Sequence, residues 1–193
     1  MIVYAGHGAY FPDESGDEED TRDEALVPVD YQQTDLFISD DELWDVLQAR
    51  PEGAGVTAIM DCCHSMSNSR ATFRFGAAPG NINIREIKPD RRQIEAHRTR
   101  TARVRSGQLK PIEAMRHIKF AACRDNEYAL EVDGQGNFTR AAISVLNRTR
   151  RSITNDQMRL EIEKAFRDDE RQHPGLECRT ADRETGFLGG FSI

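Results

Sequence analysis

Apolar residues occur in short runs near the start, in the middle and in the second half of the chain. Residues 2–5, 56–60 and 118–122 are such runs, and a loop containing glycine or cysteine follows each of them. Apolar runs of this length, bounded by loop residues, are typical of buried strands. We therefore predict three buried strands at these positions and a last short strand over 187–191.

Helical patterns lie between and after these strands. Residues 39–42 (SDDE) form a capping-box pattern that opens a helix, and Pro51 and Gly53 follow its end. Two more helices are predicted because their apolar residues share one helical face. These residues are Phe138, Ala141, Ala142, Val145 and Leu146 in the first helix, and Met158, Ile162, Ala165 and Phe166 in the second.

Two long segments lack apolar periodicity. Residues 9–38 are acidic and loop-like, whereas 66–111 are rich in serine, asparagine, glycine and arginine. We predict that the second segment is a solvated, disordered loop with a helical piece near 90–104. Strands separated by helices and loops predict one α/β domain with a mainly parallel sheet over residues 1–193.

Composition narrows the class of protein. A chain of 193 residues can bury the core of one domain, and it has no run of 18 apolar residues, so we predict no membrane partner. The N-terminus does not resemble a signal peptide, and the four cysteines form no spaced framework, which together predict reduced thiols and a cytoplasmic location. The net charge of −7 argues against nucleic acid as a partner.

Chemically reactive residues follow the first two predicted strands. His7 ends the first, and residues 61–65 (DCCHS) end the second, at the sheet edge where α/β proteins bind ligands. Strand alternation puts Asp61 and Cys63 on one face and Cys62 on the other. A cysteine nucleophile needs a nearby histidine to take its proton, and in caspases that histidine precedes the cysteine by about 50 residues. A small buried apolar residue is the alternative role for either cysteine.

Four blocks of sequence resemble the metacaspases, in the family's order and spacing. Residues 4–8 (YAGHG) resemble Y-S-G-H-G, and 61–65 resemble the first part of D-x-C-H-S-G. Between them, 23–30 match D-E-x-L-x-P-x-D and 38–42 match I-x-D-D-E. The resemblance is strong over 1–68 and looser over 117–191, where the small-subunit half of the family lies.

The resemblance implies a caspase-like three-layer sandwich with a mainly parallel sheet. It implies a large-subunit part at 1–68, an arginine-rich linker at 69–112 and a small-subunit-like part at 113–193. In the family, two strands and their helices precede the histidine strand. This chain opens directly on that strand, so we expect a domain without its first strands and helices, and an exposed apolar edge.

The same resemblance implies a cysteine endopeptidase that cleaves proteins and peptides after Arg or Lys. Cys63 would attack the scissile carbonyl, and His7 would help form the thiolate and protonate the leaving amine. Backbone N–H groups of Gly8 and Cys63 would bind the oxyanion. Asp61 would line the pocket for the residue before the cut. Met66 departs from the family, which has a glycine there.

Many metacaspases are activated by calcium, and the matching carboxylates here are Asp23, Asp40 and Asp41. Calcium binds several oxygen ligands that converge from flexible loops. The alternative role for Asp40 and Asp41 is to favour the start of the helix that follows the capping serine. A zinc site at residues 62–64 is not expected, because adjacent residues cannot all converge on one ion.

The arginine-rich segment lies where caspase relatives carry the linker between their subunits. The resemblance therefore implies self-cleavage within 70–105. The candidate sites are Arg91, Arg92, Arg98, Arg100, Arg103 and Arg105. Nucleic-acid binding by this segment is not predicted, because it lacks interleaved aromatic residues.

Two other functions stay open. A catalytically inactive caspase-like module that binds partners, or a gene fragment, would agree with the expected absence of the first strands. A hydrolase based on Ser65 or Ser67 is a weaker hypothesis, because the sequence lacks a nucleophile elbow.

Overall fold

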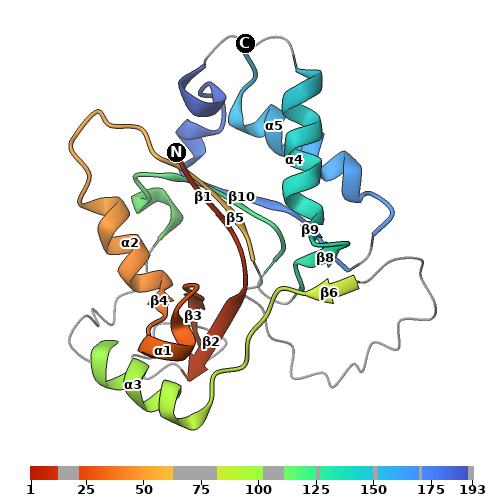
Figure 1. Ribbon diagram of the computed structural model, residues 1–193. Coiled ribbons are helices and arrows are strands. Elements are labelled where there is room, and N and C mark those ends of the chain that lie inside the picture. The colour runs from red at the N-terminus through yellow and green to blue at the C-terminus, as the bar shows by residue number, and fades with distance from the viewer. Residues whose placement is uncertain are drawn as a thin grey trace.

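A computed structural model describes residues 1–12, 22–62, 82–101, 111–124, 127–149, 152–169 and 171–190. Its central sheet has the order β1-β5-β7-β10 (Figure 1). The strands are β1 (Ile2–Ala5), β5 (Thr57–Asp61), β7 (Ile118–Ala121) and β10 (Gly175–Glu177). β1, β5 and β7 pair in parallel and β10 pairs antiparallel to β7. The prediction of an α/β fold with a mainly parallel sheet is confirmed.

Helices cover both faces of this sheet (Figure 1). On one face lies α2 (Asp40–Gln48), whose Leu43 packs against a cluster containing Ala58 and Met60. On the other lie α4 (Asn137–Arg148) and α5 (Asn155–Glu163), which pack against Phe120. The resulting three layers arise because successive β5 side chains alternate between the two clusters.

The local patterns located these helices correctly. Ser39 caps α2 by accepting a hydrogen bond from the Glu42 N–H at 3.2 Å, and the Glu42 carboxylate bonds back to the Ser39 N–H. The predicted apolar face of α4 is buried at Phe138, Ala141, Ala142 and Val145. α5 continues into a short 3-10 helix, Lys164–Phe166. Two other short 3-10 helices are Ile112–Ala114 and Thr180–Asp182.

A second sheet lies where we predicted a loop. It contains β2 (Gly8–Pro12), β3 (Arg22–Leu26) and β4 (Ile38–Ser39), all antiparallel, with the short helix α1 (Tyr31–Thr34) before β4. The loop prediction for 9–38 is therefore wrong over these elements. Apolar side chains in and beside this sheet form a third buried cluster, Ala9, Phe11, Ala25, Val27 and Phe37.

The helix α3 (Arg91–Thr101) covers that third cluster. The ring of His97 is 1% exposed and stacks on Phe11, with ring centroids 3.8 Å apart. Arg100 bonds to the Glu42 carboxylate and the Phe37 carbonyl. The helical piece predicted near 90–104 is confirmed as α3. The predicted disorder is wrong for 82–101, because His97 is buried and Ile94 partly buried, which gives this polar segment a packed position.

A third, small sheet joins the two halves of the chain. β6 (Ile82–Ile84) pairs with β8 (Leu130–Val132), which pairs with β9 (Gln135–Gly136). Asp133 and Gly134 form the hairpin turn with φ of 52° and 77°. Both angles are positive, as a two-residue hairpin of this type requires, and Asp-Gly suits them.

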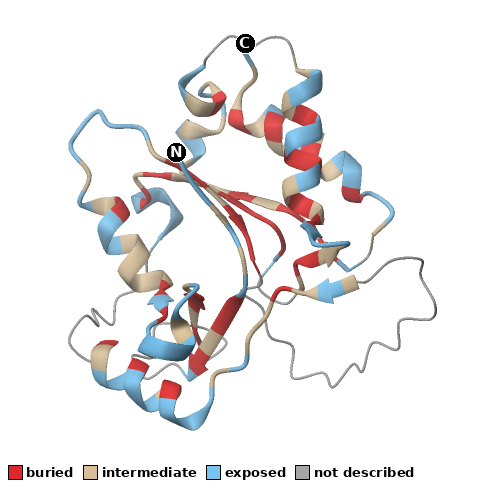
Figure 2. Cartoon of the chain, viewed as in Figure 1, coloured by how far each residue is buried: buried red, intermediate tan, exposed pale blue. Residues whose placement is uncertain are grey.

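Two predicted details are wrong. Residues 187–189 form a 3-10 helix, Phe187–Gly189, and positive φ angles at Leu188, Gly189 and Gly190 are incompatible with a strand. β1 is a strand but not a buried one, because most of it is exposed (Figure 2). Its Val3 is 55% exposed. The reason is its position at the sheet edge, which confirms the expected exposed apolar edge. In the described ranges, no helix is long and apolar enough to cross a membrane.

Candidate functional site

The carboxyl ends of β1, β5 and β7 bring three loops together. Ala5 pairs with Asp61 across β1 and β5, and the Gly6 N–H donates to the Asp61 carbonyl at 3.2 Å. Cys123, after β7, donates from its thiol to the Cys62 carbonyl at 3.9 Å. This edge therefore brings the start of the His7 loop beside the residues that precede position 63.

The side chain of His7 is exposed, and its backbone carbonyl is fixed by two hydrogen bonds. Its carbonyl accepts hydrogen bonds from the Tyr4 phenol at 2.6 Å and from the Val27 N–H at 3.2 Å. Burial raises the pKa of Tyr4 to about 12, against the lowering effect of its bond to the Val27 backbone. The Tyr4 phenol thus stays protonated and donates its hydrogen bond throughout the physiological pH range. It fixes the backbone that carries the His7 imidazole.

Tyr4 was missed by sequence reasoning as a positioning residue, although it opens the YAGHG block. Its ring folds back over Gly6, where an added Cβ would lie 2.7 Å from the phenol oxygen. Only a residue without a side chain leaves that space. A tyrosine two residues before a glycine and three before the histidine was the available signal.

Gly8 is buried, and both of its backbone groups are engaged. Its N–H donates to the Arg85 carbonyl at 2.9 Å, and its carbonyl accepts from the Ile87 N–H at 2.8 Å. A substrate oxyanion at the Gly8 N–H would have to displace the Arg85 carbonyl. The predicted oxyanion role of Gly8 therefore requires a local rearrangement of residues 85–87, which follow β6 and form an isolated bridge with Gly8.

Asp61 is 1% exposed and faces the start of α4. Its Oδ2 accepts hydrogen bonds from the Thr139 N–H at 3.0 Å and the Thr139 hydroxyl at 2.5 Å. Gly136, the N-cap of α4, has no side chain to bond the helix. The Asp61 carboxylate takes over that capping function from another strand, where negative charge also suits the helix N-terminus.

Arg85 supplies the positive charge beside this carboxylate. Its Nη1 lies 3.8 Å from Asp61 Oδ2 and donates to the Asp61 carbonyl at 3.1 Å, and its Nη2 lies 3.2 Å from the Glu131 carboxylate. Asp61 Oδ1 is buried and has no hydrogen-bond partner among the described residues. The carboxylates of Asp61 and Glu131 thus hold a guanidinium of the chain's own between them. Sequence reasoning did not assign Arg85 or Thr139 to this site.

Replacing Gly136 with alanine should destabilise the protein by about 2–4 kcal/mol. An added Cβ would lie 2.0 Å from Asp61 Oδ2 and 2.9 Å from the Arg85 guanidinium carbon, although φ is −63° and suits alanine. Urea unfolding measures the loss. Gly175→Ala is the matched control, because nothing lies within 4 Å of its added Cβ. Equal stability of the two variants would contradict this packing.

The predicted calcium ligands are not gathered into a metal site. Asp23 lies in β3 with 7% exposure, whereas Asp40 and Asp41 occupy the first turn of α2. No group of three or more His, Cys, Asp or Glu side chains within the described ranges could hold a metal ion. Asp40 and Asp41 lie where carboxylates stabilise a helix N-terminus.

Several predicted residues lie outside the described ranges. These are Cys63, His64, Ser65, Met66, Ser67, Arg103 and Arg105. The described site therefore contains His7, Gly8, Asp61 and the backbone that leads to Cys63, and the nucleophile remains a prediction from sequence.

Known proteins match the part of the chain that builds this edge. Residues 1–70 match the family model for the metacaspase peptidase C14 domain. Metacaspase III c of Phaeodactylum tricornutum is 44% identical over 86 residues, which are 44% of this chain and 25% of that protein. Metacaspase-1 of Eremothecium gossypii is 47% identical over 69 residues, or 35% of this chain and 15% of that protein. These matches span a quarter or less of the relatives' length.

A solved structure extends the likeness beyond the first third. The crystal structure of a protein from Geobacter sulfurreducens has a TM-score of 0.70 with 23% identity. It covers 96% of this chain and 69% of that one. At this identity the likeness concerns the fold alone, and it includes the sheet and helices that follow β5.

Proposed function

From its relationship to the metacaspases over residues 1–70, we propose that this chain is the catalytic part of a cysteine endopeptidase that cleaves after Arg or Lys. The pairing of β1 with β5 supports the proposal most directly. Ala5 lies opposite Asp61, and in the sequence His7 and Cys63 follow these residues by two positions each.

In the proposed reaction the Cys63 thiolate attacks the scissile carbonyl carbon, and the C–N bond then breaks. His7 takes the thiol proton and delivers it to the departing amine. Tyr4 contributes by holding the backbone of the histidine loop. Water then attacks the thioester, releasing the acid product and restoring the thiol.

The environment of Asp61 supports the proposed preference for basic residues. The carboxylate is buried, one of its oxygens lacks a hydrogen-bond partner within the described chain, and a guanidinium already lies beside it. Guanidinium groups pair with carboxylates through parallel charge-assisted hydrogen bonds. A substrate arginine would take the place next to Asp61 that Arg85 now holds.

Peptides with Arg or Lys before the cleaved bond should be hydrolysed at least about 10³-fold more efficiently than the same peptides with Asp there, because aspartate would put like charges together in a buried site. The ratio of kcat/KM values for matched fluorogenic peptides measures this. Each assay is run with millimolar calcium and with a chelator. Faster cleavage after Asp would overturn the proposed specificity.

Calcium activation is a further part of the proposal, with Asp23, Asp40 and Asp41 as the family-matched carboxylates. The described residues alone do not gather a ligand set. Higher activity with calcium than with the chelator would support a calcium site. Equal activity would leave Asp40 and Asp41 as acids that favour the start of α2.

Self-processing within 70–105 is also proposed. Proteases bind their substrates in extended form, and four candidate sites lie on α3. Arg91, Arg92 and Arg98 are exposed there, but Arg100 is tied to Glu42. Cleavage at any of the four requires α3 to unfold locally, so α3 protects these positions while it stays packed on Phe11.

An inactive caspase-like binding module is the second candidate, and Arg85 favours it. The Arg85 carbonyl occupies the Gly8 N–H, and its guanidinium occupies the Asp61 carboxylate. One residue of the chain thus fills two positions that a substrate would need. An arginine-based reagent that reacts with active cysteines would label the peptidase and leave the inactive module unlabelled.

A further inference from the structure

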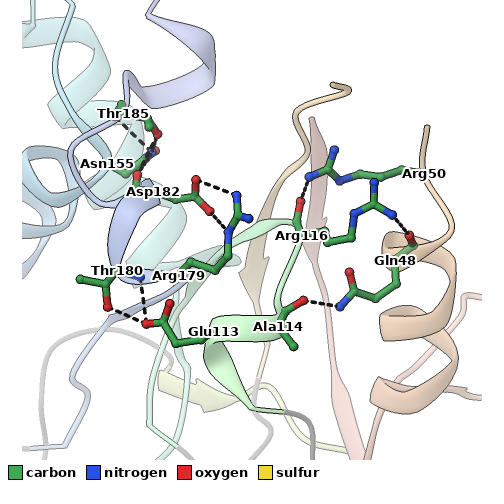
Figure 3. Close-up of polar contacts among 10 residues, drawn as sticks. All are labelled: Gln48, Arg50, Glu113, Ala114, Arg116, Asn155, Arg179, Thr180, Asp182 and Thr185. Carbon is green, nitrogen blue, oxygen red and sulfur yellow. Dashed lines mark hydrogen bonds and ion pairs between the residues drawn. The ribbon is translucent and has the colours of Figure 1, made fainter. Parts of the chain in front are cut away.

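A second polar region lies at the opposite edge of the central sheet, where the parallel strands begin. A cavity of about 910 Å³ opens there. Its lining includes Arg50 before β5, Arg116 before β7, and Arg179, Asp182 and Thr185 after β10 (Figure 3). The cavity is separated from the His7 loop by the length of the strands.

Arg50 and Arg116 are linked to each other through the backbone. Arg50 Nη2 donates to the Arg116 carbonyl, and Arg116 Nη1 donates to the Gln48 carbonyl at 2.8 Å. Gln48 in turn donates to the Ala114 carbonyl at 2.8 Å. Figure 3 shows the two guanidinium groups next to each other, held between the end of α2 and the segment before β7.

Neither arginine is neutralised within the described part of the chain. Both bond only to carbonyl oxygens, and Arg50 Nε is buried with no partner there. Arg179 beside them is different, because both of its bonds go to the Asp182 carboxylate, at 2.8 and 3.1 Å. The cavity thus contains one matched ion pair and two adjacent guanidiniums without a carboxylate.

The acids around this cavity are engaged elsewhere or exposed. Glu113 accepts hydrogen bonds from the Thr180 N–H and hydroxyl at 3.1 and 2.6 Å, and Glu52 is exposed at the rim. His117, which packs edge-on against Trp44, is neutral near pH 7 and adds no further positive charge. Its pKa is lowered to about 4, first by burial and then by Lys119, with Glu177 opposing and Arg50 contributing.

Two guanidiniums side by side repel each other unless an anion lies between them. Each guanidinium has five N–H donors in a planar fork that matches carboxylate or phosphate oxygens, and each uses one donor on a carbonyl here. Thr57 and Thr185 line the same cavity, and the Thr185 hydroxyl already donates to the Asp182 carbonyl at 2.7 Å. A cavity of this volume accommodates a small molecule.

We propose that Arg50 and Arg116 form an anion-binding site that takes the phosphate or carboxylate group of a small molecule. The site lies on the sheet edge opposite the proposed peptidase centre and does not depend on it. The acid would bridge the two guanidiniums and fill the unused donors, including Arg50 Nε.

Thermal unfolding of the purified protein tests the site, with inorganic phosphate, acetate and chloride titrated at equal ionic strength. Phosphate or acetate should raise Tm by about 3–6 °C at a concentration tenfold above Kd, and the rise should saturate. Chloride should give no saturable rise. If the rise in Tm saturates with phosphate, the site prefers a phosphate group; if it saturates with acetate, the site prefers a carboxylate.

Arg50→Gln and Arg116→Gln should each weaken binding of that anion about tenfold or more, because each removes a charged donor. Arg148→Gln on the exposed side of α4 is the matched control and should bind like the wild type. If phosphate and acetate behave like chloride in the wild-type protein, the proposal is wrong. It is also wrong if all three variants bind equally well. Isothermal titration of the wild-type protein decides the matter if the Arg116 variant fails to fold.

Discussion

Cys63→Ala should abolish peptide cleavage, lowering kcat/KM by at least about 10³-fold, whereas Cys62→Ala should leave most of it. The reason is the sequence prediction that strand alternation puts Cys63 on the face of Asp61 and Cys62 on the opposite face. Cys62 is 1% exposed and packs with Ala58 and Met60 in the core under α2. Removing its sulfur should cost about 1 kcal/mol of stability without touching the reacting atoms.

Hydrolysis of an Arg-containing fluorogenic peptide measures the first effect, and urea unfolding confirms that both variants fold. Covalent labelling adds a readout that does not need turnover. An arginine-based alkylating peptide should modify Cys63 and not Cys62, as located by mass spectrometry of the digested protein. Full activity of Cys63→Ala, or equal losses in both variants, would remove Cys63 from the reaction.

Asp61→Ala should destabilise the fold by about 3–5 kcal/mol, because it removes the acceptor at the start of α4 and one of the two carboxylates beside the buried Arg85 guanidinium, leaving Glu131 alone. The free energy of unfolding from urea titration measures this. Asp169→Ala is the matched control. Asp169 pairs with Arg171 at 2.8 Å near the surface, so its loss should cost about 1 kcal/mol or less.

Asp61→Asn separates charge from hydrogen bonding. Its amide oxygen can still accept from Thr139, so more of the stability should survive than in the alanine variant. The preference for Arg and Lys peptides should nevertheless fall, because the negative charge is gone. An asparagine variant that keeps the full preference would show that Asp61 caps α4 and does not select substrates.

Local sequence patterns predicted the elements that are stabilised by their own residues. The capping box at Ser39 and Glu42 satisfies the first turn of α2 within four residues, so a short window contains the whole interaction. The buried face of α4 was predicted for the same reason, because the spacing of its apolar residues is contained within one helix. The strands β5 and β7 were predicted correctly because short apolar runs bounded by loops are typical of buried strands.

Elements that depend on distant partners were missed. Phe11 and Ala25 form a buried hairpin face, but that face closes only when His97 of α3 stacks on Phe11. The arginine-rich sequence around His97 gave no apolar pattern strong enough to predict this contact. The exposure of β1 was expected only from the family resemblance, because its apolar residues alone predicted a buried strand and its exposure depends on its position in the strand order.

The sequence by itself determined the parallel α/β plan, the family resemblance and the placement of His7 and Asp61 at strand ends. Only the tertiary structure decided what surrounds them. Arg85 lies 24 residues from Asp61 in the chain, and Arg50 lies 66 residues from Arg116. Such pairs meet because the pairing of β1, β5 and β7 and the hairpin of β8 and β9 bring them together. Charge contacts of this kind follow from the packing of whole elements, and no local pattern encodes them.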